Sequence, residues 1–430
     1  MGLFGTSGIR RIADRDLLEI ALRVGLALGK SHGRVVVARD TRTSGEALKY
    51  ALMAGLMSAG SKCYDAGVAP TPTLAFSTRD FDAGVMLTAS HNPPEYNGIK
   101  IFNPDGSSYV TTQQDELERL LSGPLPATSW QKMKDSCSPY TEAVEKHTAH
   151  IMRQLKVARK TRIVIDCTCG AACVISPFLL RQMGCDVVGV NTHPSGFFPH
   201  DAEPTEGNVG DLRRICSKLG SVGIVHDGDA DRMMAIDEKG RFIPGDKLLV
   251  LLARAQGAKD IVTTVDASMI VEEQGMRAVR TKVGDTYVSE QLLRKGDFGG
   301  EPSGAWVFPK NSLCPDGIYA AALLASIASE NTLSSLVDAI PQYPIIRGSI
   351  SNADGTPDIE AVGRTETPAR IENVDGSKLI FEDGWVLIRP SGTEPKVRIT
   401  AEARTEARAR QLYDMVVNSR HKVSSEGQRS

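Results

Sequence analysis

The chain has 430 residues, of which 41% are hydrophobic and 24% are charged, and its formal net charge at pH 7 is −2. A chain of this length can bury several hydrophobic cores, and ordinary domain sizes predict three or four domains. Because no basic stripe or tail accompanies the near-balanced charge, neither nucleic acid nor an anionic membrane is expected as the main partner. The apolar runs at 248–255 and 319–328 are too short to span a membrane, and the N-terminus lacks a signal-like core, so we expect a cytoplasmic protein.

Helix and strand patterns alternate over most of the chain. Asp14 is placed to cap a helix whose apolar residues share one face from Leu17 to Leu28. Further strands are predicted at 34–38, 62–68, 162–166 and 186–190, and further helices at 46–58, 139–155, 175–183 and 317–329. This alternation is typical of parallel sheets covered by helices. After about residue 344 the pattern changes: strands are predicted at 345–351 and 397–401, a hairpin at 378–388, a helix at 406–420 and a frayed polar end at 419–430.

A serine stands where an apolar strand breaks into a proline-rich turn. Residues 82–89 have the pattern of a short buried strand, and Ser90-His91-Asn92-Pro93-Pro94 follows. A serine at a rigid strand end can act as a nucleophile once a base or a metal activates it, and His91 and Lys100 are close in sequence. Taken alone, the same residues could be a turn-capping serine and a lysine exposed on a strand.

Three aspartates, Asp227, Asp229 and Asp231, alternate between two apolar runs and are followed by Arg232. At an effective dielectric constant of about 20, two unit charges about 4 Å apart interact by about 4 kcal/mol, so this crowding favours a bound divalent cation. Ligands that are all oxygen suit Mg²⁺ or Ca²⁺. A helix-flanked calcium loop fits poorly because Arg232 takes the place of its required glycine, and an acidic surface hairpin leaves the arginine unexplained. A hard cation beside Arg232 suits a phosphoryl group.

A third polar loop, Arg389-Pro390-Ser391-Gly392-Thr393, follows the predicted hairpin, and Arg398 lies on the strand after it. Arginines, hydroxyls and a glycine whose N–H can closely approach an anion are the composition of a phosphate cradle. An ordinary polar turn with surface arginines has the same composition.

Together the three loops resemble those of the α-D-phosphohexomutase family, and the match extends over nearly the whole chain. Within the family the chain most resembles the phosphoglucosamine mutases, whose members often begin with a run like residues 4–10. Members carry, in this order, a phosphorylated serine loop like 88–94, a magnesium loop like 227–232, a sugar loop like Gly300-Glu301-Pro302-Ser303-Gly304 and a phosphate loop like 389–393. The opening 4–10 also resembles the family's start, in which the arginine, here Arg10, reaches the catalytic serine. The resemblance implies an α/β fold: three similar mixed α/β domains at 1–137, 138–244 and 245–343, and a smaller α+β C-terminal domain at 344–430, around a central cleft.

The same resemblance implies an enzyme that interconverts glucosamine 6-phosphate and glucosamine 1-phosphate through a phosphoserine and a sugar 1,6-bisphosphate intermediate. Ser90 would carry the phosphoryl group and help Asp227, Asp229 and Asp231 to bind Mg²⁺. The remaining implied roles are catalysis for His91, Lys100, Arg10 and Arg232, sugar binding for Glu301 and Ser303, and phosphate binding for Arg389, Ser391, Gly392, Thr393 and Arg398. The alternatives are a phosphomannomutase or phosphoglucomutase acting on mannose or glucose phosphates, a phosphatase that uses the same phosphoserine, and a non-catalytic binding module. The expected partners are hexose or hexosamine phosphates, and a homodimer is compatible with this interpretation.

Some residues depart from the family pattern or fall outside it. Asp285 and Trp306 stand where several relatives carry histidine, and we interpret them as a helix cap and a packed aromatic residue. The cysteines at 167, 169 and 173 lack the spacing of a metal knuckle and are expected to be structural thiols. His147 and His150 lie three residues apart on a predicted helix without evident carboxylate partners, which predicts surface histidines.

Overall fold

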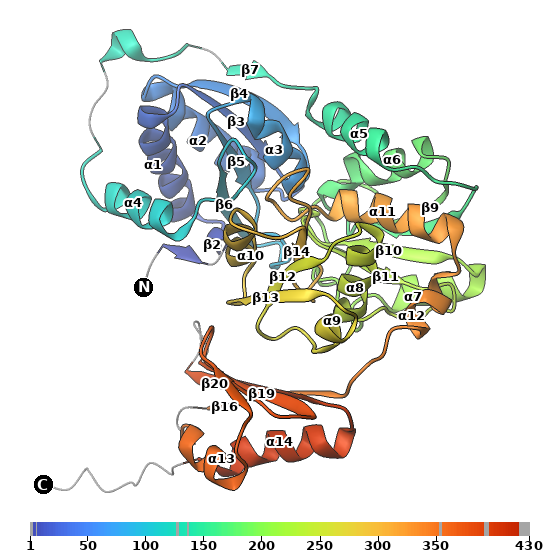
Figure 1. Cartoon of the computed structure of the whole chain (residues 1–430). Coiled ribbons are helices and arrows are strands. Elements are labelled where there is room, and N and C mark those ends of the chain that lie inside the picture. The colour runs from blue at the N-terminus through green and yellow to red at the C-terminus, as the bar shows by residue number, and fades with distance from the viewer. Residues whose placement is uncertain are drawn as a thin grey trace, which may run out of the picture. The chain divides into compact units, whose positions relative to one another are not determined.

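The computed structural model describes residues 3–5, 7–125, 129–135, 137–351, 355–390 and 395–420. Two units are distinguished by their internal contacts (Figure 1). The first consists of Met1–Val262 and Gly284–Ala339, and the second of Thr263–Val283 and Ile340–Ser430.

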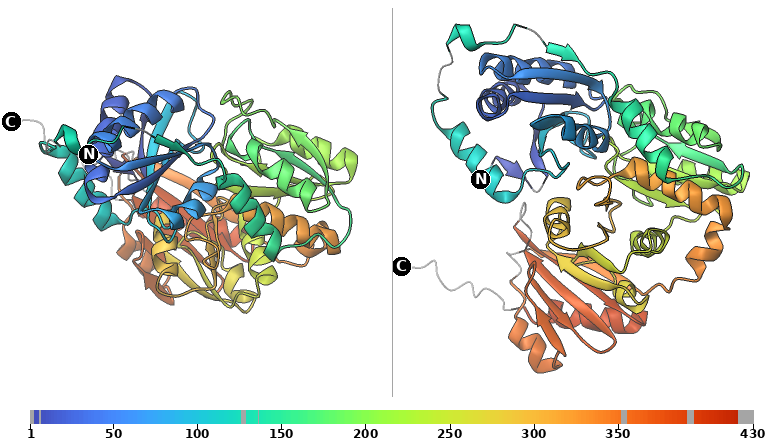
Figure 2. Two further views of the ribbon diagram at one scale, coloured as in Figure 1. Left: turned by 90° about the horizontal axis from the view of Figure 1, so that it is seen from above. Right: turned by 45° about the horizontal axis from the view of Figure 1, so that its top comes forward.

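The N-terminal sheet of the first unit has seven strands in the order β1-β2-β6-β5-β3-β4-β7. Their bounds are β1 Phe4–Gly5, β2 Gly8–Ile12, β3 Arg34–Arg39, β4 Lys62–Val68, β5 Ala83–Leu87, β6 Tyr96–Phe102 and β7 Cys137–Pro139. Alternate residues of β3 belong to two different cores, Val35 and Val37 on one face and Val36 and Ala38 on the other. Helices α1 (Arg15–Ser31) and α2 (Gly45–Ser58) cover the first face, and α3 (Thr71–Ser77) covers the second (Figures 1 and 2). Helix α4 (Thr111–Ser122) packs against α1.

A second sheet of the same unit has the order β11-β10-β8-β9. Its strands are β8 Arg162–Asp166, β9 Asp186–Val190, β10 Val222–His226 and β11 Met233–Ile236, and its helices are α5 Ala143–Gln154, α6 Ser176–Gln182 and α7 Gly210–Leu219. Strand β8 pairs in parallel with β9 and β10, whereas β10 and β11 form an antiparallel hairpin. The three alternating aspartates therefore lie between two strands, which excludes the helix-flanked calcium loop.

The rest of the first unit contains the predicted sugar loop. Its elements are α8 Gly245–Ala255, α10 Asp285–Leu292, β14 Phe298–Gly300, β15 Trp306–Val307, α11 Gly317–Glu330 and α12 Leu333–Asp338. Strands β14 and β15 are antiparallel, and the sugar loop connects them. Between α8 and α10 the chain forms β12 Asp260–Thr264, which ends within the second unit, and then α9 Ile270–Glu273 and β13 Arg277–Thr281, which belong to the second unit.

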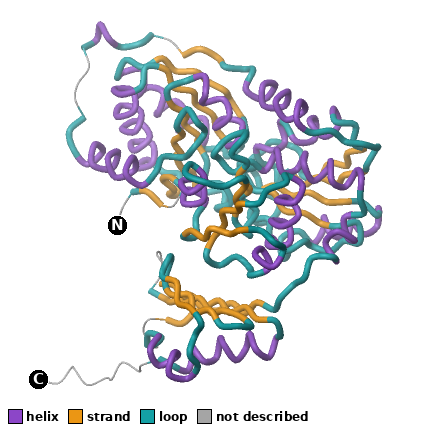
Figure 3. The backbone as a smooth tube through the Cα atoms, viewed as in Figure 1, coloured by secondary structure: helices purple, strands orange, loops and turns teal. Residues whose placement is uncertain are grey.

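The second unit is built on a five-stranded antiparallel sheet, in the order β16-β20-β19-β18-β17. Strands are drawn in orange in Figure 3. Its elements are β16 Ile345–Ser351, α13 Ile359–Thr365, β17 Arg370–Glu372, β18 Ser377–Ile380, β19 Gly384–Pro390, β20 Lys396–Ala403 and α14 Glu406–Asn418. One face of β19 packs Val386 and Ile388 into a core with residues of α13 and α14. The other face packs Trp385 and Leu387 against Val265.

The expected fold class is confirmed: mixed α/β sheets covered by helices are followed by a smaller α+β part. The N-terminal sheet is mixed, as expected: β3 pairs in parallel with β4 and β5, whereas β6 pairs antiparallel with both β5 and β2. The domain limits drawn from the sequence stay predictions. No helix among the described residues is long and apolar enough to cross a membrane.

The expectation of two surface histidines is also wrong. His147 is 1% exposed, and its Nε2 lies 3.1 Å from Asp316 Oδ2, a carboxylate 169 residues away in sequence. His150 is half-buried and contacts Asn311 Oδ1. Helical spacing alone did not indicate these partners, because they come from a distant loop.

Candidate active site

Ser90 lies three residues beyond the end of β5 in a strained backbone conformation. Its φ of 51° is in the left-handed region, which costs a residue with a side chain on the order of 1–2 kcal/mol. Its N–H donates to Thr88 Oγ1 at 2.8 Å, and its hydroxyl donates to Asp227 Oδ2 at 2.6 Å. Ser90 is 1% exposed, so these bonds fix its side chain against the aspartate loop.

The aspartate loop closely approaches the serine loop. A Cβ on Gly228 would lie 2.5 Å from the Ser90 carbonyl oxygen, so this position requires glycine. Asp227 and Asp229 are fully buried and Asp231 is 6% exposed, which excludes an acidic surface hairpin. One oxygen from each of the three carboxylates lies within 4.8 Å of the others. Among the described residues, Asp229 Oδ1 is the buried side-chain oxygen without a hydrogen-bond partner.

Lys100, on β6, supplies positive charge to this cluster. Its Nζ donates to Asp229 Oδ2 at 2.8 Å and to Asp231 Oδ2 at 2.6 Å. Burial opposes its charge, but the two carboxylates raise the pKa of Lys100 above its ordinary value. Burial likewise opposes ionisation of Asp229, yet Lys100 and a hydrogen bond from Thr71 hold the Asp229 pKa low.

The other two carboxylates of the cluster behave differently. Burial, followed by the charge of the neighbouring aspartates, raises the pKa of both Asp227 and Asp231. The pKa of these two carboxylates stays raised even though Arg232 and, for Asp231, Lys100 act against it, so the cluster is short of positive charge. A divalent cation bound by oxygen ligands would supply it, and the orphaned Asp229 Oδ1 is a suitable ligand.

The predicted catalytic histidine and arginines border the serine. His91 Nδ1 lies 3.4 Å from Ser90 Oγ, and burial together with Arg232 and Arg10 lowers the pKa of His91 to about 2. Its imidazole is therefore neutral at pH 7. Arg10, on β2, donates from Nη1 to Asn92 Oδ1 at 3.2 Å, and Arg232 Nη1 pairs with Glu203 Oε1 at 3.1 Å.

The sugar loop and the residue that follows the turn between β14 and β15 are joined to the aspartate hairpin by hydrogen bonds to and from the backbone of Met233. Met233 N–H donates to the Gly304 carbonyl at 2.9 Å, and Trp306 Nε1 donates to the Met233 carbonyl at 2.7 Å. Trp306 is fully buried, as expected of a packed aromatic residue. Glu301 Oε1 accepts from the Gly284 N–H at 2.7 Å, and Ser303 Oγ lies 3.4 Å from Glu301 Oε2.

Asp285 is not a helix cap, contrary to expectation. It is the first residue of α10, Gly284 is the cap residue, and Asp285 Oδ1 accepts a hydrogen bond of 2.5 Å from Ser7 Oγ. The acid thus connects α10 to the N-terminal segment that carries Arg10.

The second unit holds the described part of the predicted phosphate loop. Arg389 on β19 and Arg398 on β20 are direct cross-strand partners, so both side chains project from the same face of the sheet. Asp375 Oδ2 pairs with Arg389 Nη1 at 3.0 Å. Ser391, Gly392 and Thr393 lie outside the described residues.

Sequence reasoning missed several residues that hold the site together. Thr71, at the start of α3, donates from its hydroxyl to Asp229 Oδ2 at 2.5 Å and from its N–H to the Asp229 carbonyl at 2.9 Å. Asp40 and Arg42 follow β3 and contact the serine loop. A usable signal did exist for these two, because polar residues that follow adjacent parallel strands meet at one sheet edge.

The chain is similar in sequence and in structure to known proteins. Four family models match the chain, described as phosphoglucomutase/phosphomannomutase alpha/beta/alpha domain I at residues 1–124, domain II at 138–240, domain III at 244–343 and the C-terminal domain at 353–419. A probable phosphoglucosamine mutase from Methanocella arvoryzae is 45% identical over 96% of this chain and 96% of its own. Another from Methanococcoides burtonii is 45% identical over 97% of this chain and 98% of its own. A solved phosphoglucomutase/phosphomannomutase family protein from Burkholderia thailandensis is 25% identical, with a TM-score of 0.84 over 97% of this chain and 96% of that one.

Proposed function

The chain belongs to the α-D-phosphohexomutase family, and we propose that it interconverts glucosamine 6-phosphate and glucosamine 1-phosphate by way of a phosphorylated Ser90. The observation that carries the proposal is the 2.6 Å hydrogen bond from Ser90 Oγ to Asp227, within a cluster of three buried carboxylates. The choice of a glucosamine phosphate is supported by the two relatives named above, each 45% identical over nearly the whole chain.

The donor set of the cluster fits Mg²⁺. Asp227, Asp229 and Asp231 offer carboxylate oxygens within reach of one another, one of them without a hydrogen-bond partner, and the Ser90 hydroxyl borders them. When bound, the cation would neutralise charge on the phosphoryl group and make Ser90 a better leaving group.

Each phosphoryl transfer forms one O–P bond and breaks another. The free hydroxyl oxygen of a sugar monophosphate attacks the phosphorus carried by Ser90; the new O–P bond forms, the Oγ–P bond breaks, and the sugar hydroxyl's proton ends on Ser90 Oγ. The resulting sugar 1,6-bisphosphate reorients, and Ser90 Oγ attacks the other phosphorus, so that its proton passes to the sugar oxygen that is released. The same bisphosphate, supplied from solution, would phosphorylate a fresh enzyme.

Charged residues around Ser90 serve these transfers. We assign to Lys100 the role of proton carrier because it lies buried in the aspartate cluster that borders Ser90; a cation bound there would weaken the two carboxylate contacts that raise the pKa of Lys100. Arg10 and Arg232 stabilise the negative charge of the phosphoryl group in flight. Neutral His91 acts as a hydrogen-bonding partner of Ser90 Oγ.

Two further loops bind the substrate in this proposal. Glu301 and Ser303 bind sugar hydroxyls, while Arg389, Ser391, Gly392, Thr393 and Arg398 bind the phosphate that is not reacting. The like charges of Arg389 and Arg398, paired across two strands, support a bound anion at that face.

Steady-state kinetics on the 1-phosphates of glucosamine, N-acetylglucosamine, glucose and mannose test the proposal. We expect the highest kcat/KM with glucosamine 1-phosphate, whereas a preference for glucose or mannose would identify a phosphoglucomutase or phosphomannomutase. Intact-mass analysis after treatment with the sugar bisphosphate should show one added phosphate on the wild type and none on Ser90→Ala. The matched variant Ser77→Ala, at a buried serine that bonds only its own helix, should still be phosphorylated. A phosphate that maps to another residue contradicts the role of Ser90, and release of inorganic phosphate without isomerisation would identify a phosphatase.

A further inference from the structure

An arginine outside the predicted site uses all five of its guanidinium N–H groups, four on backbone carbonyls and one on a buried carboxylate. Arg42 Nη2 donates to the carbonyls of Ser90 and Asn92 at 2.8 and 2.6 Å, and Nη1 donates to those of Pro93 and Tyr96 at 2.6 and 2.9 Å. The fifth donor, Nε, pairs with Asp40 Oδ2 at 3.0 Å. Four of the five donors therefore bind one segment, residues 90–96, which begins with the catalytic serine.

The composition of that segment explains its need for an external donor. Pro93 and Pro94 have no N–H, so they cannot provide the donors that a turn of this length would otherwise use. The carbonyl of the buried Ser90 needs a protein partner, and those of Asn92, Pro93 and Tyr96 are at least partly shielded by the guanidinium itself. Arg42 satisfies these carbonyls together and thereby fixes the path of the backbone on both sides of the prolines.

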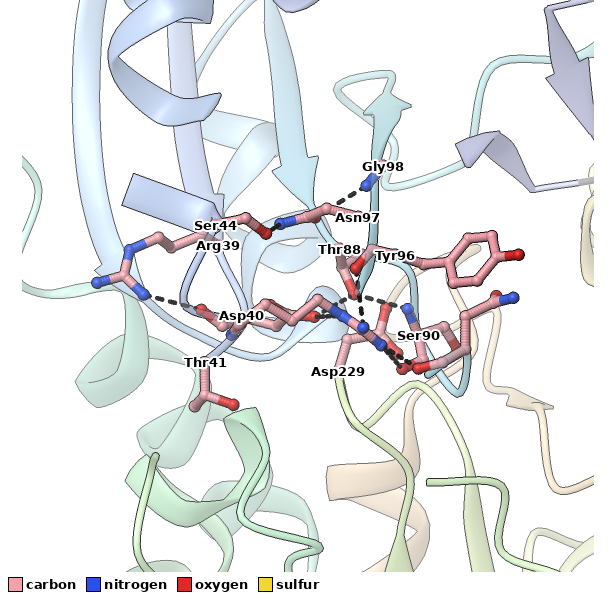
Figure 4. A network of polar contacts seen from close by, with 12 residues as sticks. Arg39, Asp40, Thr41, Ser44, Thr88, Ser90, Tyr96, Asn97, Gly98 and Asp229 are labelled. Carbon is pink, nitrogen blue, oxygen red and sulfur yellow. Dashed lines mark hydrogen bonds and ion pairs between the residues drawn. The ribbon is translucent and has the colours of Figure 1, made fainter. Parts of the chain in front are cut away.

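Asp40 extends the same network to the strained backbone of Ser90. Its Oδ2 accepts from Thr88 Oγ1 at 2.7 Å, and Thr88 Oγ1 accepts the Ser90 N–H at 2.8 Å (Figure 4). The Ser90 peptide groups are thus held on one side through Thr88 and on the other through Arg42. Two independent contacts of this kind can maintain a φ of 51° that the residue would not adopt alone.

The surroundings of Arg42 make the network rigid. The side chains of Arg42 and Asp40 are both fully buried, and the ring of Phe198 lies 5.0 Å from the guanidinium carbon. A lysine could not replace the arginine here, because an ammonium offers three donors from one point instead of five in a planar fork. A merely structural ion pair would not direct four of five donors to a single loop.

We propose that Arg42, with Asp40 and Thr88, positions the backbone of the Ser90 loop so that Ser90 Oγ is correctly placed for phosphoryl transfer. Arg42 is a positioning residue that acts through Ser90, and the inference rests on the proposed function of Ser90. Its effect belongs to the transfer step and not to sugar binding, because its contacts are to backbone carbonyls and to Asp40.

The first test compares Arg42→Lys with Arg280→Lys. Arg280 is a matched control, since its guanidinium also binds three backbone carbonyls and a glutamate, within the second unit. We expect Arg42→Lys to slow phosphoserine formation from the sugar bisphosphate at least tenfold in single turnover, with the KM for the monophosphate within twofold of wild type. Arg280→Lys should keep the wild-type transfer rate. Equal transfer rates in the two variants would overturn the proposal.

Three further variants distinguish loss of positioning from simple unfolding. Thr88→Val removes the hydroxyl that bonds Ser90 and should reproduce the loss of transfer rate, whereas Thr88→Ser should restore it. In Arg42→Ala, added millimolar guanidinium should recover part of the transfer rate and should have no effect on Ser90→Ala. Absence of rescue in both Thr88→Ser and the guanidinium experiment would show a role in folding alone.

A conformational readout separates this inference from the proposed function. Hydrogen exchange of peptides covering 88–98 should be at least tenfold faster in Arg42→Lys than in wild type or Arg280→Lys. If wild-type enzyme gains no phosphate on Ser90, the proposed function fails, and the exchange result still decides whether Arg42 fixes the loop. Unchanged exchange in an enzyme that does form phosphoserine overturns the positioning role itself.

Discussion

A shortage of positive charge dominates the site at the scale of single residues. Lys100 bonds two of the three carboxylates, and the third, Asp227, accepts the serine hydroxyl. Burial makes each ionised carboxylate expensive unless it is paired. A cation bound by the cluster would compete with Lys100 for carboxylate oxygens, and loss of one carboxylate should weaken its binding directly.

Replacing Asp229 by asparagine should reduce Mg²⁺ affinity by about tenfold or more, because the site loses one anionic oxygen ligand. Titration calorimetry measures the affinity, and activity should require correspondingly more Mg²⁺. Asp237→Asn provides the control, since Asp237 is equally buried just after β11 but bonds only its own turn. Equal Mg²⁺ affinity in wild type and Asp229→Asn would remove this residue from the metal site.

Thr71 should matter for the same site although it offers no ligand to the cation. Its hydroxyl fixes Asp229 Oδ2, and loss of such supporting hydrogen bonds lowers metal affinity by about 10–100-fold. Thr71→Val is expected to raise the Mg²⁺ concentration for half-maximal activity about tenfold. Thr73→Val, two residues along the same helix, should leave it unchanged, because Thr73 Oγ1 bonds His147 instead. The prediction fails if the two variants have the same Mg²⁺ requirement.

At the scale of elements, the site is assembled from loops that follow neighbouring strands. Strands β3 and β5 pair in parallel up to Arg39 and Leu87, so Asp40 and Ser90 leave the same edge of the sheet. The strands at 62–68, 162–166, 186–190 and 345–351 could be predicted residue by residue, because each is a clear apolar or alternating run between turns. Strands of two or three residues, such as β1, β14 and β15, have no such periodicity and could not be predicted.

Among the site residues, too, some could be predicted from the sequence and others could not. Ser90 and the three aspartates could be identified because each motif is contiguous in sequence and chemically unusual. Thr71 and Asp316 could not, because their partners lie 158 and 169 residues away, and Arg42 was missed although it follows a strand that is parallel to β5. His147 is an example: its spacing on the helix predicted a surface residue, but in the fold it is buried and bonds Thr73 and Asp316.

His147 joins three elements and should therefore contribute strongly to stability. Its ring bonds Thr73 of α3 and Asp316 at the start of α11, and it stacks on Phe76. His147→Ala leaves two buried polar groups without this partner and opens a cavity, which should lower the free energy of unfolding by about 2–4 kcal/mol. Replacing the half-buried His150, on the same helix, by alanine should lower the free energy of unfolding by only about 1 kcal/mol. Urea unfolding measures both, and equal losses would contradict the role assigned to His147.

At the scale of the whole molecule, the second unit combines two distant parts of the chain. Residues 263–283 belong with the C-terminal sheet because polar contacts join them at buried positions. Glu402 accepts from Ser268 Oγ, from the Met269 N–H and from Trp385 Nε1. Lys378 Nζ donates to the Val265 carbonyl at 2.7 Å and lies 3.8 Å from the Trp385 ring centre. Among the described residues, Lys378 has its hydrogen bond to a carbonyl and not to a carboxylate, and such a buried lysine makes the stability of this unit depend on pH.

Burial lowers the pKa of Lys378 to about 7, whereas a lysine in an unfolded chain titrates near 10.4. Between these two values the unfolded state binds a proton that the folded state does not bind. The free energy of unfolding contributed by Lys378 therefore falls as pH decreases from about 10.4 to 7 and is constant below pH 7. Lys378→Met removes this dependence, so the variant should gain stability relative to wild type as pH decreases, by on the order of 3 kcal/mol between pH 10 and pH 7. Urea unfolding at half-unit pH steps measures the difference, with Lys218→Met as the control because Lys218 is exposed on α7. A constant difference between Lys378→Met and wild type over this pH range would show that Lys378 is protonated in both states, with the Val265 carbonyl and the Trp385 ring fully compensating the burial of its charge.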